Sequence, residues 1–397
     1  MYYLLRIFVW LGLKIFCRTI HVNRPALLKT KGPLVLASNH PNAFLDAIIL
    51  GSLFYQPVHF LARGDAFRKP LIRKFLNALQ LIPIHRLTEG KENLSQNEAS
   101  FFKCHQILSS GGIVLIFAEG MSFNQWMLRP MKKGTARIAL AAMNDTGLGS
   151  KVRILPVSLN YNSFESLSKT LLIHFGEMIS LKDFSADQPE TKRMHQFNGL
   201  LAEQLSAGML QSATHTQIIQ MLISNHEQRD VPYLKTMQAA LNSGSDPAVL
   251  EKLKMPGSIA PDPASCLFHL LLTLILFAPA AAGWLLHVPM YFPLKKIVHR
   301  KTTGTGFFDS VMFCALMIIY PVYWLMLNIL IQPLLKNEWI RLSLIFMPLL
   351  GWVSLYWKEN FLRMWNYFIL TGKERAMLNG ISQEVNGIAR RSAAKEG

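Results

Sequence analysis

The chain has 397 residues, of which 51% are apolar and only 16% are charged, and its mean hydropathy is +0.23. This composition is too apolar for an ordinary soluble enzyme and too polar for a bare bundle of membrane helices, so we expect a soluble domain joined to membrane segments. The formal net charge of +17 indicates an anionic partner. Because no nucleic-acid-binding module is recognisable, we predict anionic membrane lipids as that partner and no nucleic acid.

The N-terminal segment, residues 1–24, begins with an apolar run that Arg6 and Lys14 interrupt. No small-residue cleavage site follows this run, which argues against a signal peptide. We predict an interfacial or membrane helix instead.

Residues 25–184 alternate short β-like runs with helical ones, which predicts an α/β domain whose helices pack on a largely buried sheet. The predicted strands cover residues 34–37, 58–62, 81–84, 113–117, 154–159 and 171–175. The predicted helices cover residues 43–53, 69–79, 97–108 and 135–143.

The rest of the chain changes character twice. Residues 185–262 are polar and helix-prone and end in a linker rich in proline and glycine. Residues 263–357 form a predicted helical membrane region, with spans at about 307–331 and 340–357 and a third apolar run at 266–293. Residues 358–397 form a basic tail.

The distribution of basic residues predicts the membrane topology. A basic loop at residues 295–301 and the basic tail both belong on the cytoplasmic side, so the last two spans form a hairpin. A single crossing by residues 266–293 would place the N-terminal domain outside the cytoplasm. Pro279 and the small residues after it favour a re-entrant or interfacial hairpin, which keeps that domain on the cytoplasmic face of a multi-pass membrane protein.

The four cysteines (Cys17, Cys104, Cys266 and Cys314) are scattered and have no CxxC spacing. This pattern predicts neither disulfides nor a zinc site and fits a reducing compartment. The histidines also lack a metal-ligand spacing, so we predict no metal ion and no cofactor.

The stretch from Asn39 to Asp46 places His40 and Asp46 close together, directly after the apolar run 34–37. A carboxylate that orients a histidine makes it a ready general base. The alternative is a purely structural hydrogen bond between the two side chains.

Three further segments accompany this pair. They are 81–86, which ends on Arg86; 117–134, which contains Ala118-Glu119-Gly120 and Leu128-Arg129-Pro130; and 154–158, which contains Pro156. In order and spacing the four blocks resemble those of the glycerolipid acyltransferase family, which includes lysophosphatidic acid and glycerol-3-phosphate acyltransferases. The resemblance covers about residues 25–180 and implies a mixed sheet flanked by helices.

The resemblance implies roles for individual residues. His40 would be the general base, with Asp46 as its orienting partner, and Arg86 would bind the phosphate of the acceptor. Pro156 would shape the acyl site, and the substrate-binding residues would also include Glu119, Gly120 and Ser122. Two structural alternatives remain open: Arg86 as a solvated residue at a strand end, and Pro156 as a proline in or beside a strand.

The sequence departs from the family pattern in two places. His40 and Asp46 are separated by one residue more than is usual, so we expect His40 to precede a helix that carries Asp46 on its second turn. After Glu119 and Gly120, Met121 and Ser122 stand where Thr-Arg is common. The phosphate site therefore lacks one expected charge, and the substitutes we predict are three cations downstream: Arg129, Lys132 and Lys133.

The predicted function is a membrane-bound O-acyltransferase. The acyl donor would be a thioester, either acyl-CoA or an acyl carrier protein, which is then a partner. The expected acceptor is a lyso-glycerolipid, 1-acylglycerol-3-phosphate, with glycerol 3-phosphate as the runner-up. Two alternatives stay open: another lyso-lipid acceptor such as an aminoacyl lipid, and an inactive membrane lipid-binding scaffold with the same fold. The absence of GxSxG agrees with direct transfer, without an acyl-enzyme.

Overall fold

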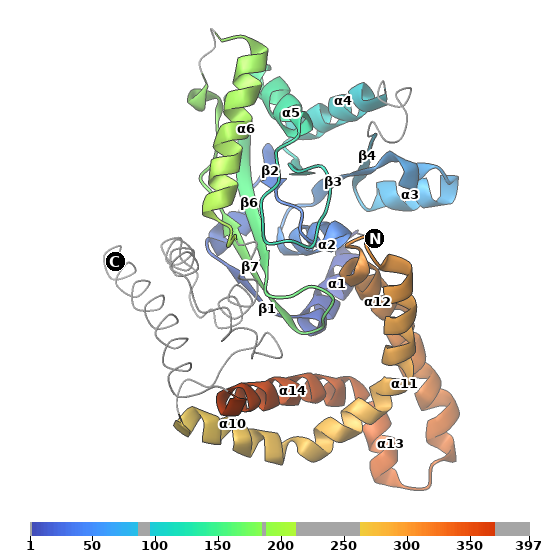
Figure 1. Ribbon diagram of the computed structural model, residues 1–397. Coiled ribbons are helices and arrows are strands. Elements are labelled where there is room, and N and C mark those ends of the chain that lie inside the picture. The colour runs from blue at the N-terminus through green and yellow to red at the C-terminus, as the bar shows by residue number, and fades with distance from the viewer. Residues whose placement is uncertain (1, 86–95, 185–187, 212–262, 370–397) are drawn as a thin grey trace.

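The computed structural model describes residues 2–85, 96–184, 188–211 and 263–369 (Figure 1). Arg86, residues 185–187 and 212–262 of the polar extension and residues 370–397 of the basic tail lie outside these ranges, so the predictions for them stay untested.

A seven-stranded sheet forms the N-terminal domain, in the order β1-β7-β6-β2-β5-β3-β4. Strands β2 to β6 run parallel to one another, and β1 pairs with β7 in parallel. Strand β7 pairs with β6 antiparallel, so the sheet is mixed as predicted. The strands are β1 (Cys17–Val22), β2 (Leu34–Ser38), β3 (Val58–Arg63), β4 (Leu81–Ile84), β5 (Ile113–Phe117), β6 (Arg153–Tyr161) and β7 (Lys169–Phe175).

Helices cover both faces of the sheet, which explains why the strands read as continuous apolar runs. On strand β2, Leu34 and Leu36 face one core, and Val35 and Ala37 face the other. The first core contains side chains of α1 (Tyr2–Phe16) and α2 (Ala43–Leu53). The second contains side chains of α4 (Gln96–Ser109), α5 (Lys133–Asn144) and α6 (Glu190–Ala207), while α3 (Pro70–Ala78) lies beside β4.

Strand β1 was missed by the sequence analysis. Residues 17–22 pair in parallel with β7, so the predicted boundary between an N-terminal helix and the α/β domain at residue 24 is wrong. The helix ends at Phe16, and the next six residues alternate too weakly to be recognised as a strand at the sheet edge.

The C-terminal region contains α10 (Pro263–Ile275), α11 (Phe277–Thr302), α12 (Phe308–Met326), α13 (Glu338–Ile345) and α14 (Met347–Ile369). Helices α10 and α11 both pack against α14, and α12 extends from this group to α1 and α2 (Figure 1). The start of α12 enters the first core of the α/β domain, where Phe313 contacts Phe16 edge to face at 5.3 Å.

Two predictions for this region need correction, and a third stays open. The run 266–293 consists of α10 and the first part of α11, which meet at Leu276 with a bend of 59°, so it is either a broken span or a re-entrant element. The basic residues 295–301 lie in the last turns of α11 and not in a loop. The predicted span 340–357 is divided between α13 and α14 at Phe346.

Among the described helices, residues 308–330 are long and apolar enough to cross a membrane, and the bent α10–α11 pair also qualifies if it counts as one span. The multi-pass topology and its orientation stay predictions.

Candidate active site

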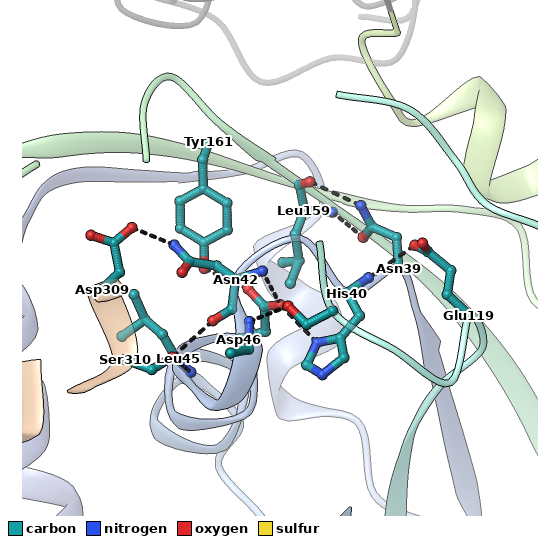
Figure 2. Close-up of polar contacts among 12 residues, drawn as sticks. Asn39, His40, Asn42, Leu45, Asp46, Glu119, Leu159, Tyr161, Asp309 and Ser310 are labelled. Atoms are coloured by element: carbon teal, nitrogen blue, oxygen red, sulfur yellow. Dashed lines mark hydrogen bonds and ion pairs between the residues drawn. The ribbon is translucent and has the colours of Figure 1, made fainter. Parts of the chain in front are cut away.

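The candidate site lies at the carboxyl ends of the parallel strands, the edge at which open α/β sheets usually bind ligands. His40 follows β2, Glu119 follows β5, and Tyr161 ends β6 (Figure 2). The parallel register brings these three strand ends to the same edge, although the residues are far apart in the sequence.

His40 and Asp46 form the pair that the sequence predicts. The Nδ1 atom of His40 lies 2.9 Å from Oδ2 of Asp46. The imidazole stacks on the ring of Phe117, with the ring centroids 3.7 Å apart and the planes 9° from parallel. The His40 side chain keeps 12% of its surface exposed, whereas Asp46 is fully buried. The ring is thus held on one face and one edge, and its Nε2 atom is turned away from Asp46.

The buried Asp46 carboxylate has two further hydrogen-bond donors. Its Oδ2 accepts the backbone N–H of Asn42 at 2.8 Å, and its Oδ1 accepts the Tyr161 hydroxyl at 2.7 Å. Burial raises the pKa of Tyr161 well above its ordinary value, which keeps the phenol protonated as a donor. Because an unsatisfied buried charge is costly, these contacts stabilise the carboxylate where it orients His40.

The turn between the two residues accommodates the additional residue. Helix α2 starts at Ala43, which has a φ of 45°, a left-handed conformation that costs a residue with a Cβ about 1 kcal/mol. Asp46 consequently lies on the first turn of α2, and the prediction that it lies on the second turn is wrong.

Ser122 stabilises this strained turn. Its hydroxyl oxygen accepts the backbone N–H of Ala43 at 2.6 Å. The departure from the family pattern after Gly120 therefore has a structural use here: the serine secures the turn that carries His40.

Glu119 binds the backbone next to the histidine. Its Oε1 accepts the amide N–H of His40 at 3.0 Å, and the carbonyl of His40 accepts the amide of Phe123 at 3.2 Å. Burial, with a smaller contribution from the Asp46 charge, raises the pKa of Glu119 to about 7, although the bond from His40 opposes this shift. Gly120 follows with a φ of +69°, and a Cβ there would lie 2.9 Å from Cγ of Lys132.

Residues 19–160, which contain all of these groups except Tyr161, match the family model described as acyltransferase. The chain contains a domain of the acyltransferase family. The match confirms the resemblance found in the sequence and extends it through most of β1.

Comparison with solved structures finds the crystal structure of the 1-acyl-sn-glycerophosphate (LPA) acyltransferase PlsC from Thermotoga maritima. It is 16% identical to this chain, with a TM-score of 0.36, and the alignment covers 52% of this chain and 80% of that one. No curated protein matches the sequence.

The predicted cations of the acyltransferase domain lie on the segment between β5 and α5. The Arg129 guanidinium stands 3.3 Å from the ring centroid of Phe123, and Lys132 and Lys133 are exposed at the start of α5. Arg86 lies outside the described residues. Pro156 is buried inside β6, paired with Ala37, before the strand reaches the edge where His40 lies.

The first amides of α2 are already engaged. Those of Asn42, Ala43 and Leu45 donate to Asp46, Ser122 and Ser310, respectively. These three amides therefore cannot hold an oxyanion without leaving their present partners, which argues against an oxyanion site built from them.

Several residues that hold the site were missed by the sequence analysis. The amide side chain of Asn39 makes two hydrogen bonds with the backbone of Leu159 on β6, at 2.8 and 3.1 Å. Asn42 bonds to Asp309, at the start of α12. The polar run 39–42 after a buried strand was a usable signal for the two asparagines, but nothing in the local sequence indicates Tyr161 or Asp309.

Proposed function

We propose that the protein is a membrane-bound O-acyltransferase of lipid synthesis that transfers a fatty acyl group from a thioester to the hydroxyl of 1-acylglycerol-3-phosphate. The donor is acyl-CoA or an acylated carrier protein. Glycerol 3-phosphate is the runner-up acceptor. The proposal goes beyond the acyltransferase membership of the domain in naming the acceptor, the donor and the base.

The observation that carries the proposal is the His40–Asp46 pair. Asp46 has no exposed surface and three hydrogen-bond donors, one of them His40 itself. A carboxylate bound to Nδ1 fixes the tautomer that leaves Nε2 as the proton acceptor. This arrangement suits general-base catalysis on a hydroxyl.

The proposed reaction needs no covalent enzyme intermediate. Nε2 of His40 takes the proton of the acceptor hydroxyl as its oxygen attacks the thioester carbonyl carbon. The carbon–sulfur bond then breaks, and the leaving thiolate takes the proton from the imidazolium. The products are the ester and the free thiol, and His40 returns to its neutral form.

A phosphate on the acceptor fits the charges beside the site. The charge of Arg129 acts on the carboxyl group of Glu119, and the side chain of Lys132 lies against Gly120. Guanidinium and ammonium groups both bind phosphate oxygens, and arginine can bind two at once. These cations are our proposed substitutes for the arginine that the family commonly carries after this glycine.

A lipid acceptor fits the apolar surfaces of the molecule. Helix α1 exposes Tyr3, Ile7 and Leu11, with exposed fractions of 62%, 61% and 53%. Residues 308–330 are long and apolar enough to cross a bilayer. Because α1 and α12 both contact α2, an acceptor held in the membrane would lie near the helix that carries Asp46. We propose that this domain faces the cytoplasm, with the bent α10–α11 pair as a re-entrant element and the basic residues 295–301 on the cytoplasmic side.

One observation favours a second candidate acceptor. The side chain at position 122 is engaged with Ala43 and carries no charge, so the segment holds one cation fewer than a phosphomonoester site of this family commonly has. A different lyso-lipid, such as an aminoacyl lipid, is therefore the second candidate.

The proposal is tested by acyl transfer in membranes that contain the protein, with labelled acyl-CoA or acylated carrier protein and a panel of acceptors. We expect product from 1-acylglycerol-3-phosphate that disappears with His40→Ala. Product from a phosphate-free lyso-lipid alone would support the second candidate. Absence of His40-dependent product from every donor and acceptor would contradict both and favour an inactive lipid-binding scaffold.

A further inference from the structure

The start of α12 touches the turn that carries the catalytic pair. Ser310 is fully buried, and its hydroxyl makes two hydrogen bonds to this turn. It accepts the backbone N–H of Leu45 at 2.9 Å and donates to the carbonyl of Asn42 at 3.0 Å (Figure 2). One side chain thus links the two ends of the first turn of α2, directly before Asp46.

The neighbouring Asp309 holds the same turn by a second route. Its Oδ2 accepts the side-chain amide of Asn42 at 2.8 Å, and only 1% of the residue is exposed. Asn42 is therefore bound by its carbonyl and its side chain to α12, while its backbone N–H donates to Asp46. A shift of α12 would move the residue that donates to the carboxylate.

A buried lysine connects this contact to the opposite side of Asp46. Lys169 is fully buried at the start of β7 and forms an ion pair with Asp309. Its ammonium group lies 5.8 Å from the ring centroid of Tyr161, whose hydroxyl donates to Asp46. Besides His40, Asp46 has two hydrogen-bond donors, Asn42 and Tyr161. Both of them thus lie next to the Asp309–Lys169 pair.

The packing around this contact joins α12 to the acyltransferase domain as one core. Phe308, Met312 and Phe313 are buried in the same apolar cluster as Leu45 and Ile49 of α2. At Gly12 the two helices α1 and α12 approach so closely that a Cβ would lie 2.1 Å from the sulfur of Met317. A tightly packed interface of this kind resists small displacements.

From these contacts we infer that Ser310 and Asp309 are positioning residues for acyl transfer: the C-terminal helical region completes the active site by holding the turn that places Asp46 against His40. The inference rests on the proposed function, since it concerns the same reaction. Helix α12 is long and apolar enough to cross a membrane, and the inference gives it a role in catalysis as well. The helix lies outside residues 19–160, which match the family model.

The main test uses Ser310→Ala in the full-length protein, because alanine removes both hydrogen bonds and little volume. We expect kcat for acyl transfer to fall between about tenfold and a hundredfold, the range that a misplaced catalytic group produces, with the KM values of donor and acceptor unchanged. The matched control is Ser354→Ala, which removes a hydroxyl that bonds to carbonyls of Ala280 and Leu350 within the C-terminal region. This control should keep the wild-type rate.

A double-mutant cycle separates positioning from general damage to the fold. If Ser310 acts through Asp46, Ser310→Ala should lower the rate by less than about twofold in an Asp46→Asn background. An equal loss in both backgrounds, a change confined to KM, or a wild-type rate for Ser310→Ala would overturn the inference. The wild type and His40→Ala are compared before any variant of α12 is measured. Equal rates of transfer in these two proteins would overturn the proposed function as well.

A second variant covers the case in which Ser310→Ala does not fold, as judged by its melting temperature in detergent. The double substitution Asp309→Leu, Lys169→Met removes both charges of the buried pair at once, which is better tolerated than removing one. It deletes the acceptor for the Asn42 amide, so kcat should again fall at least about tenfold at unchanged KM. A rate within about twofold of wild type would overturn the inference.

Discussion

Two turns at the same edge of the sheet differ in burial: the first, here called the firm turn, is mostly buried, whereas the second is partly exposed along its length. The turn after β2 carries His40 and Asp46, and hydrogen bonds from β6, α12 and the segment after β5 secure it. The segment after β5 binds the first turn through Glu119, Ser122 and the amide of Phe123. The indole N–H of Trp126 also donates to the carbonyl of Tyr161 at 2.7 Å, yet the segment exposes Met121 and Met127. This difference suggests a division of labour, with the chemistry in the rigid turn and acceptor recognition in the exposed segment.

The firm turn should be sensitive to the loss of a single hydrogen bond. Tyr161→Phe removes the donor to Asp46 Oδ1, and a hydrogen bond to a charged group contributes about 2 kcal/mol. We expect kcat to fall about thirtyfold with KM unchanged, as measured by initial rates of acyl transfer. Tyr323→Phe, which removes a hydroxyl bonded to Leu286 within the C-terminal region, is the control. Equal rates for the two variants would show that the firm turn does not depend on this bond.

The exposed segment should affect binding more than chemistry. Arg129→Ala removes the guanidinium above Phe123, and we expect the KM for 1-acylglycerol-3-phosphate to rise about fivefold while kcat stays within about twofold. Arg137→Ala is a matched control, because that arginine lies over Phe101 at 4.8 Å and bonds to Glu98. A fall in kcat with an unchanged KM would show that Arg129 acts in the chemical step, and it would contradict the proposed division between the two turns.

The smallest effect concerns Glu119, the residue that joins the two turns. Because burial raises its pKa from 4.5 to about 7, ionisation is harder in the folded state than in the unfolded one. The stability that protonated Glu119 contributes to the fold is therefore lost as pH rises from about 4.5 to about 7. Glu119→Gln should remove this pH dependence. The melting temperature of the variant, measured relative to that of the wild type, should therefore rise by about 5 °C from pH 4.5 to pH 7.

The control for this experiment is Glu177→Gln, whose carboxylate is exposed and paired with Arg24. It should keep the pH dependence of the wild type. Parallel melting curves for the wild type and Glu119→Gln across this pH range would contradict the buried, protonatable state of Glu119.

The sequence predicted six of the seven strands, the four helices between them and the pairing of His40 with Asp46. It succeeded there because long apolar runs and local spacing are properties of neighbouring residues. The edge strand β1 was missed, since residues 17–22 are only partly buried and show no clear alternation. The extra residue before Asp46 was noticed, but its accommodation by a left-handed Ala43 depends on Ser122, which is 79 residues away.

The contacts that hold the candidate site were beyond the reach of sequence reasoning for the same physical reason. Tyr161 is 115 residues from Asp46, and Ser310 is 265 residues from Leu45. A serine at the start of an apolar helix and a tyrosine at the end of a strand have many ordinary uses, and only the folded chain shows which partners they meet. The C-terminal region could therefore be recognised as apolar from its composition, while its contact with the turn that carries His40 and Asp46 could not.

The most direct test of this account compares two histidine–aspartate pairs in the same protein. His105 lies 3.1 Å from Asp145, but both side chains are about one-third exposed, and the pair lies away from the carboxyl edge of the sheet. We predict that His40→Ala lowers the rate of acyl transfer from labelled acyl-CoA by about 10³-fold, whereas His105→Ala keeps the wild-type rate. Transfer that survives His40→Ala at the wild-type rate would contradict the assignment of His40 as the base.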